Sequence, residues 1–411
     1  MNFRFRPTVL AATMAAAAVA LTATAHAAPA DSPAPPASQG STAASRDAST
    51  AEIAITPGHD AEGIGITKGV DVTVSGGKLT AVEMHSLPTG TETMGTMSPD
   101  GTSWKPDTAL ARGTKYSITA TAKDAHGRTA TEKSSFTTVA PEKSFIGYFT
   151  PEDGETVGVG MPVSINFDKP ITDRKAVQSA IHVTSTGDQP IAGHWFSPTR
   201  LDFRPQDYWK PDSDVTVKLE LDGVQGGDGI TGVQNKTFGF HIGRSQVSTV
   251  DAKTKTMTVV RDGKTLKTIP VSTGSAENPT YNGQMVISEK HDEMRMDGST
   301  VGFTDEDGKA EYDIPDVPHA MRLSASGTFL HGNYWAAKDV FGKTNTSHGC
   351  IGLSDLKGGK DPSTPAAWFY ANSLVGDVVI VKHSDDETIR PDNGLSDWNM
   401  PWSTWTEGSA A

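Results

Sequence analysis

The sequence predicts a mainly β protein of several domains. Short runs of alternating apolar and polar residues recur between clusters of Gly, Pro, Asp and Asn, which is typical of many short strands. The 411 residues include 41 glycines and 25 prolines but only one cysteine. A chain of this length forms about two to four domains. The formal charge of −13 argues against a nucleic-acid partner, because such partners need basic stripes.

Residues 1–27 are predicted to be an export signal. Arg4 and Arg6 precede an apolar Ala-rich run, and Ala25-His26-Ala27 has the small-x-small pattern of a cleavage site. The alternative is an uncleaved membrane anchor, since the run approaches the shortest spanning length. Residues 28–50 are mainly Pro, Ala and Ser and are predicted to be a disordered linker. We therefore expect an exported protein.

Residues 51–140 and 141–246 are predicted to be two β-sandwiches of the immunoglobulin-like kind. Alternating runs separated by turn residues mark their strands, at 70–74, 116–122, 161–167, 201–205, 215–221 and 236–243. The four residues Trp104–Asp107 read Trp-Lys-Pro-Asp, and the same letters recur at Trp209–Asp212. This echo favours two copies of one module. Neither region contains a cysteine pair, so neither has the central disulfide of antibody domains.

Residues 247–382 are predicted to form a third, mostly β domain with one or two helices. Residues 255–274 read as a hairpin with Asp262-Gly263 at its turn. Further strands are expected at 284–289, 327–331 and 377–382. One helix begins at Pro365, with Thr364 as its cap, and continues through "AAWFYANSL". Residues 383–411 contain three tryptophans and are expected to form a C-terminal cap that stacks on a domain surface.

The single cysteine, Cys350, is the strongest chemical signal in the chain. Exported proteins usually pair their cysteines, so a lone one indicates a reactive thiol or an intermolecular bridge; a buried inert cysteine is the alternative. His348 and His331 precede it and offer a base for the thiol. Gly349 and Gly352 leave room for a substrate, and let neighbouring N–H groups converge as an oxyanion site requires. The pattern indicates thiol-dependent acyl transfer.

Two other interpretations of these residues stay open at this point. His331, His348 and Cys350 could ligate zinc, although a single cysteine and no carboxylate at a ligand spacing disfavour this. We therefore expect no metal and no cofactor. Either histidine could also be a hydrogen-bonded core residue.

The stretch "HGNYWAAKDVFGKTNTSHGCIGLS" (331–354) resembles the His-x(n)-Ser-His-Gly-Cys signature of the L,D-transpeptidases, whose catalytic module is called the YkuD domain. Similarity to the actinobacterial branch of this family extends through nearly the whole mature chain, at 250–274, 278–283, 296–302, 326–332 and 394–402. Members of that branch carry a signal peptide or anchor, a linker, two immunoglobulin-like domains and the catalytic domain. The resemblance thus implies a YkuD-type fold for the third domain.

The resemblance implies peptidoglycan cross-linking. Cys350 would attack the third residue of a donor tetrapeptide stem, a diamino acid, and D-alanine would leave as a thioester forms. The side-chain amine of an acceptor stem would resolve the thioester into a 3→3 cross-link, whereas water as acceptor would make an L,D-carboxypeptidase. Carbapenem-type β-lactams would acylate Cys350. The site of action would be the cell wall, on the extracellular face of the cytoplasmic membrane.

The resemblance also implies roles for individual residues. His331 matches the general acid/base, and its expected place at a strand end is a rigid support for an imidazole. His348 is the competing candidate for the base and is assigned to shaping the pocket. The N–H groups of Gly349 and Cys350 are the expected oxyanion donors. The residues expected to line the substrate cleft are Met296, Tyr312, Ser326, Gly327, Ser347 and Gly352.

Two positions depart from the family pattern. Gly332 stands where many relatives carry Ser, at a position whose main-chain carbonyl orients the histidine. Gly352 stands where many relatives carry Asn or Arg, so a substrate contact from that side chain is lost here. Both departures bear on substrate preference.

Three rival functions remain on sequence grounds. A sortase would need an arginine soon after the cysteine, and none occurs before Arg390. A papain-like endopeptidase would usually place its histidine after the cysteine, whereas His331 and His348 precede it. The third rival is a non-catalytic wall-binding protein built on the sandwiches, which would have no use for this His/Cys set.

Overall fold

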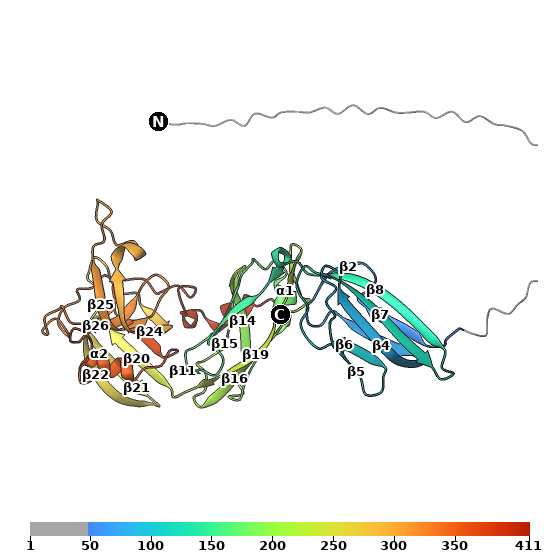
Figure 1. Ribbon diagram of the computed structural model, residues 1–411. Helices are drawn as coiled ribbons and strands as arrows, with labels where there is room; N and C mark the ends of the chain where they lie inside the picture. Colours follow the sequence, from blue (N-terminus) through green and yellow to red (C-terminus); the bar gives the residue numbers. More distant parts are fainter. Residues whose placement is uncertain (1–47) are drawn as a thin grey trace, which may run out of the picture. The chain divides into compact units, whose positions relative to one another are not determined.

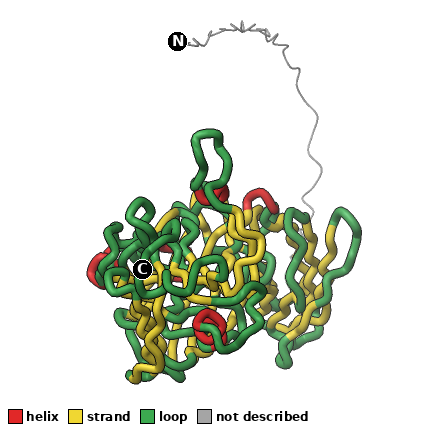
Figure 2. Tube along the Cα trace, turned by 90° about the vertical axis from the view of Figure 1, so that its left-hand side faces the viewer, coloured by secondary structure: helices red, strands yellow, loops and turns green. Residues whose placement is uncertain are grey.

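The computed structural model describes residues 48–411, so the expected export signal and most of the linker lie outside it. Residues Ala48–Ala411 form one compact unit, and the boundaries expected near residues 140, 246 and 382 remain predictions. Strands and loops make up nearly all of the described chain, with only short helices (Figure 2). None of these helices is long and apolar enough to cross a membrane.

The first region is a sandwich of two four-stranded sheets (Figure 1). Val72, Ile118 and Phe136 are fully buried between the sheets, because alternate residues of each strand point inward. The first sheet has the order β1 (Glu52–Thr56), β3 (Asp71–Ser75), β6 (Ser103–Pro106), β5 (Gly95–Met97). The second has the order β2 (Ala61–Ile64), β8 (Thr129–Thr138), β7 (Lys115–Asp124), β4 (Gly77–Ser86).

The second region is also a sandwich, so the prediction of two immunoglobulin-like domains is confirmed. One sheet has the order β10 (Gly147–Thr150), β12 (Val163–Phe167), β15 (Arg200–Pro205), β14 (Ile191–Ser197). The other has the order β11 (Thr156–Val157), β19 (Asn235–Ile242), β16 (Ser213–Glu220), β13 (Ile181–Ser185). Smaller elements complete it: η1 (Pro141–Lys143), α1 (Arg174–Ser179), and a sheet of β17 (Gln225–Gly227), β18 (Ile230–Gly232) and β9 (Ser144–Phe145).

The repeated Trp-Lys-Pro-Asp segment does not mark equivalent positions in the two sandwiches, contrary to our expectation. Trp104 lies within strand β6, paired with β3 and β5. Trp209 lies in a loop before β16, where its indole N–H donates to the Met161 carbonyl at 2.6 Å. Both side chains are buried. The shared letters thus contain a buried tryptophan in each sandwich, in two different backbone conformations.

A nine-stranded sheet forms the third region. Its order is β23 (Gly283–Val286), β28 (Val378–Lys382), β20 (Gln246–Asp251), β21 (Thr256–Arg261), β22 (Lys264–Ser272), β27 (Ile351–Ser354), β26 (Phe329–Asn333), β25 (Asp313–Arg322), β24 (Glu289–Asp297). The hairpin of β21 and β22 turns at Asp262 and Gly263, both with positive φ (49° and 75°), as a two-residue turn of the primed type requires.

One expected strand, 284–289, is in fact divided between the two edges of the sheet. Strand β23 pairs with β28 and ends at Val286, whereas β24 begins at Glu289 and pairs with β25. The Ser288 N–H already donates to the Arg322 carbonyl, at 3.0 Å. Met285, Val286 and Ile287 are buried whereas Glu289 is exposed, and this short apolar run does not reveal the change of partner.

The expected helix is present as α2 (Pro365–Ala371). The Thr364 hydroxyl accepts from the Ala367 N–H, and Pro365 occupies the first turn. The helix ends at Ala371, short of the run that we expected to continue to Leu374. Asn372 is its C-cap, with its N–H bonded to the carbonyls of the last turn.

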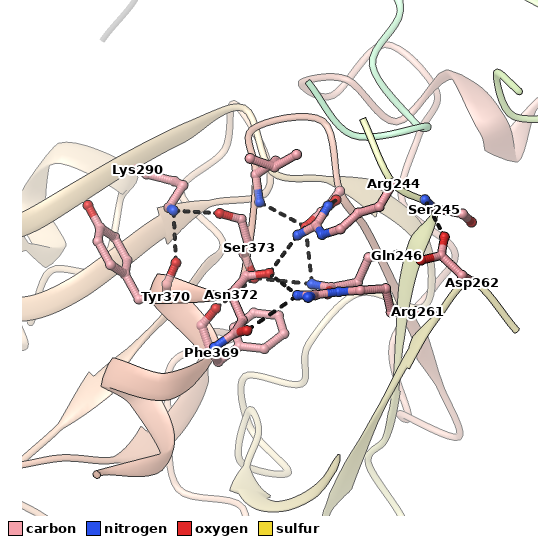
Figure 3. A network of polar contacts seen from close by, with 12 residues as sticks. Arg244, Ser245, Gln246, Arg261, Asp262, Lys290, Phe369, Tyr370, Asn372 and Ser373 are labelled. Carbon is pink, nitrogen blue, oxygen red and sulfur yellow. Dashed lines mark hydrogen bonds and ion pairs between the residues drawn. The ribbon is translucent and has the colours of Figure 1, made fainter. Parts of the chain in front are cut away.

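A polar network fixes the entry to the third region (Figure 3). The Arg244 guanidinium donates to both carboxylate oxygens of Asp377, at 2.7 and 2.8 Å. Gln246 also donates to Asp377, and Arg261 donates to Gln246 and to the Asn372 carbonyl. Burial raises the pKa of Asp377 even though Arg244 opposes the shift. The network joins β20 and β21 to the end of α2.

The C-terminal segment packs on the second sandwich. It contains η3 (Asp397–Asn399) and α3 (Trp402–Glu407). The Arg204 guanidinium, from β15, lies 4.7 Å from the ring centre of Trp398 and 4.2 Å from that of Trp405. Trp398 belongs to the core of that sandwich. The expected tryptophan cap is therefore present, and the surface that it covers is that of the preceding domain.

Replacing Arg244 should destabilise the protein. In Arg244→Ala the Asp377 carboxylate would stay buried without its cation, and removal of one partner of such a pair costs about 3 kcal/mol. Thermal scans at pH 7 should show a lower unfolding temperature than wild type. The difference should narrow toward pH 4, because a protonated Asp377 carries no charge. An Arg244→Lys control should lie between the two, and a variant with wild-type unfolding at pH 7 would contradict this account.

Candidate active site

Parallel pairing of two short strands brings the lone cysteine beside His331. Cys350 directly precedes β27, and His331 lies in β26, opposite Gly352 of β27. The two residues are only 8% and 4% exposed. Both line one cavity of about 580 Å³. The eighteen residues between them in the sequence form one crossover.

The Cys350 thiol is held by main-chain groups. The Phe329 N–H lies 3.4 Å from Sγ, and the thiol is 3.7 Å from the Gly327 carbonyl that accepts from it. Burial raises the pKa of Cys350 to about 11, and the Phe329 amide offsets only part of this rise. The resting site therefore holds a neutral thiol.

The orientation of His331 identifies its tautomer. Its Nδ1 lies 2.9 Å from the Gly332 carbonyl oxygen. Because a carbonyl can only accept, Nδ1 carries the hydrogen and Nε2 keeps its lone pair. Burial lowers the pKa of His331. A neutral imidazole with a free Nε2 is the form that can take a proton from a thiol.

The ring of Trp335 stacks on His331, with 5.6 Å between ring centres and 14° between planes. Trp335 and Phe329, which both line this cavity, were not among the residues expected from the sequence. Phe329 and His331 are two apart in a strand and so share a face, a signal that could have identified Phe329.

His348 contacts the segment that covers the cavity. We call residues 297–312, between the ends of β24 and β25, the flap; it includes η2 (Gly298–Val301) and is drawn in orange in Figure 1. His348 Nε2 lies 3.0 Å from the Glu311 carboxylate. The rings of Phe303 and Tyr312 lie 5.3 and 5.0 Å from the imidazole, centre to centre. His348 thus joins the flap to the loop that carries the cysteine.

A second cavity of about 300 Å³ adjoins the first. The two share Val301, Gly327 and His348 as lining residues. Two substrates could therefore approach Cys350 from different sides. This division of space suits a reaction with two substrates.

Most of the other residues expected at the site line one of the two cavities, and two of them line neither. Met296, Tyr312, Gly327 and Ser347 line the first cavity, whereas Ser326, Gly327 and Gly349 line the second. Burial raises the pKa of Tyr312 to about 12, so its hydroxyl stays protonated at neutral pH. Gly349 has φ of 102°, in the left-handed region, which explains a glycine before the cysteine.

Gly332 and Gly352 line neither cavity. A Cβ on Gly352 would lie 3.4 Å from the Asn333 side-chain nitrogen, on the side of the strand that meets β26. A Cβ on Gly332 would lie only 2.2 Å from a carboxylate oxygen of Asp355. The structure therefore gives Gly352 no place in the cleft that we expected it to line, and places Gly332 against a buried carboxylate.

Within residues 48–411, no three His, Cys, Asp or Glu side chains are grouped so that they could hold a metal ion. The site combines a buried thiol, a buried imidazole with a free Nε2, and an adjoining two-part cavity. These features define a cysteine acyltransferase.

Comparison with known proteins identifies the family. The model of the L,D-transpeptidase catalytic domain matches residues 245–381, and that of a bacterial Ig domain matches residues 61–225. The chain is 36% identical over 350 residues to L,D-transpeptidase 2 of Mycobacterium tuberculosis. The match covers 85% of this chain and 83% of that protein. It is 32% identical over 325 residues to L,D-transpeptidase 5 of the same species, covering 77% and 68%.

A solved structure of the L,D-transpeptidase LdtMt1 in complex with imipenem is 30% identical, with a TM-score of 0.48, and covers 59% of this chain and 100% of that one. The sequence matches carry the conclusion: the chain belongs to the L,D-transpeptidase family, and resembles its mycobacterial members. It is a cysteine acyltransferase of peptidoglycan cross-linking, not a sortase, a papain-like endopeptidase or a non-catalytic wall-binding protein.

The raised pKa of Cys350 predicts a specific pH dependence of alkylation. With a pKa of about 11, the thiolate fraction without substrate should rise tenfold per pH unit between pH 7 and pH 10. The rate of iodoacetamide labelling, read by intact mass, should follow that slope. A plateau starting near pH 7 would contradict this, since it would reveal a preformed thiolate–imidazolium pair.

Proposed function

We propose that this chain cross-links peptidoglycan stems through a Cys350 thioester. A donor tetrapeptide occupies the first cavity, with the carbonyl of its third residue at Sγ. The Nε2 of His331 takes the thiol proton as sulfur attacks that carbonyl. His331 then gives the proton to the departing amine of D-alanine, and the acyl group remains on Cys350.

The second half of the reaction uses the same imidazole in the reverse direction. The side-chain amine of the diamino acid in an acceptor stem attacks the thioester, from the side of the second cavity. Nε2 of His331 takes the proton of the attacking amine and returns a proton to sulfur as the thiol leaves. The product is a 3→3 cross-link. Water in place of the amine would give the tripeptide of an L,D-carboxypeptidase.

The N–H groups of Gly349 and Cys350 would stabilise the tetrahedral oxyanion in both halves. Donors aimed at developing charge in a site shielded from water are worth more than the same donors in solution. The left-handed backbone at Gly349 supports this proposal, because it turns the chain directly before the thiol.

One observation carries the proposal more than any other. A neutral imidazole with a free Nε2, on β26, and a neutral thiol, directly before β27, lie buried beside one cavity. Proton transfer from the thiol to Nε2 generates the nucleophile as sulfur attacks the bound substrate. This arrangement favours an amide carbonyl as the target and limits reaction of the resting thiol.

Carbapenem-type β-lactams are the proposed inhibitors. Solved relatives include an enzyme in complex with imipenem and another in complex with a faropenem-derived adduct. The first cavity of this chain offers Cys350 to a β-lactam carbonyl as it does to a stem. We further propose that the enzyme works outside the cell, in the wall, because residues 1–27 have the pattern of an export signal.

The proposed reaction is tested with the purified chain and a disaccharide-tetrapeptide, read by mass spectrometry. Wild type should give a thioester on Cys350, free D-alanine and a 3→3 dimer. Cys350→Ala should give none of these. His331→Ala should slow thioester formation by about 10²–10⁴-fold, the usual contribution of a positioned general base.

The matched control is His348→Ala, which removes the other imidazole that lines the first cavity together with Cys350. Because His348 contacts the flap, this variant should keep more activity than His331→Ala. Equal losses in the two variants would contradict the assignment of the base. Tripeptide without dimer would show that water is the acceptor, and a folded wild type without thioester would overturn the proposal.

A further inference from the structure

A second histidine–carboxylate pair lies behind the catalytic histidine. His319 Nδ1 is 2.7 Å from an oxygen of Asp355. The side chain of Asp355 is 0% exposed and that of His319 is 12% exposed. Neither residue lines either cavity. The reaction proposed above does not use the pair. Burying two such groups costs free energy unless they are well hydrogen-bonded, so the pair calls for an explanation.

Both carboxylate oxygens and the N–H of Asp355 are hydrogen-bonded. Its other carboxylate oxygen accepts from the Leu356 N–H at 2.8 Å and from the Thr364 hydroxyl at 2.9 Å. Its own N–H lies 3.3 Å from the Asn333 carbonyl, at the end of β26. The carboxylate is thereby fixed between the end of β27, the start of α2 and the strand that carries His331.

His319 is also constrained. It has φ of 53°, in a region that residues other than glycine rarely adopt. The ring of Tyr370 lies 5.1 Å from its imidazole, centre to centre. A Cβ on Gly359 would be 2.9 Å from its Cε1, so the chain approaches the ring closely there. Such a conformation persists only where the surroundings enforce it.

The pair packs directly against Gly332. A Cβ on Gly332 would lie 2.2 Å from the Asp355 carboxylate and 2.9 Å from Cγ of Pro318, the neighbour of His319. The carbonyl of the same Gly332 holds Nδ1 of His331, at 2.9 Å. The carboxylate therefore occupies the space where a side chain would stand on the residue that orients the base.

We propose that His319 and Asp355 are positioning residues for His331. They fix the Gly332 peptide so that its carbonyl keeps the hydrogen on Nδ1 and leaves Nε2 for the thiol. Glycine at position 332, the departure from the serine of many relatives, is a requirement of this pair. The inference rests on the proposed role of His331 as the base.

The test is a double-variant cycle. Gly332→Ala introduces a methyl group that collides with Asp355 and displaces the peptide. It should lower kcat at least about tenfold, since small misplacements of a catalytic group cost this much or more. KM should change less than about twofold, because no cavity residue is altered. Asp355→Gly should also lower kcat.

The double variant Gly332→Ala/Asp355→Gly should be more active than Gly332→Ala alone, because the methyl group then has room. Effects that simply multiply would overturn the proposal. Asp361→Asn is the control: this half-buried carboxylate accepts from the Ser363 N–H in the same connection, and its replacement should leave kcat unchanged.

A readout independent of turnover separates this inference from the proposed function. The Nδ1 proton of His331 should give a slowly exchanging NMR signal in the full wild-type chain, and should broaden or vanish in Gly332→Ala and Asp355→Gly. A wild type that makes no thioester but shows this behaviour would refute the function and keep the positioning role. An unchanged signal in both folded variants would refute the positioning role.

Discussion

Burial of Cys350 and His331 at the junction of β26 and β27 determines the chemistry of this enzyme. Removal from water raises the pKa of the thiol and lowers that of the imidazole, so both rest neutral. Charge develops only when the proton moves between them during acylation. A buried neutral thiol is also slow to oxidise, because the thiolate is the reactive form. That property suits an unpaired cysteine.

The surrounding structure keeps this pair in place and controls access to it. The Gly332 carbonyl sets the tautomer of His331, and the His319–Asp355 pair packs behind that carbonyl. On the open side, His348 bonds to Glu311 of the flap and lines both cavities. Substrate specificity can therefore change at the flap without disturbing the thiol and its base.

Much of the fold follows from local sequence signals. Alternation with period two predicts the sandwich strands. Asp262-Gly263 predicts the hairpin of β21 and β22, and Thr364-Pro365 predicts the start of α2. The split of 284–289 between β23 and β24 was not predictable, because the apolar residues end at Ile287 and nothing in Ser288-Glu289 marks a change of pairing partner. Nor did the tryptophans of the C-terminal segment indicate that Arg204 of another domain receives them. At the site, the lone cysteine and its motif indicated Cys350 and His331, but Asp355 and His319 are 36 positions apart and have no shared pattern.

The most direct test of this account is an NMR titration of His331 in the substrate-free enzyme, with ¹⁵N-labelled histidine, from pH 5 to pH 9. We predict a neutral imidazole with the hydrogen on Nδ1 over the range from pH 7 upward, and protonation only below the usual histidine pKa of about 6.5. The account would be contradicted if His331 were an imidazolium at pH 7 in the wild type and neutral at the same pH in Cys350→Ala. That result would mean that the resting enzyme holds a thiolate–imidazolium pair.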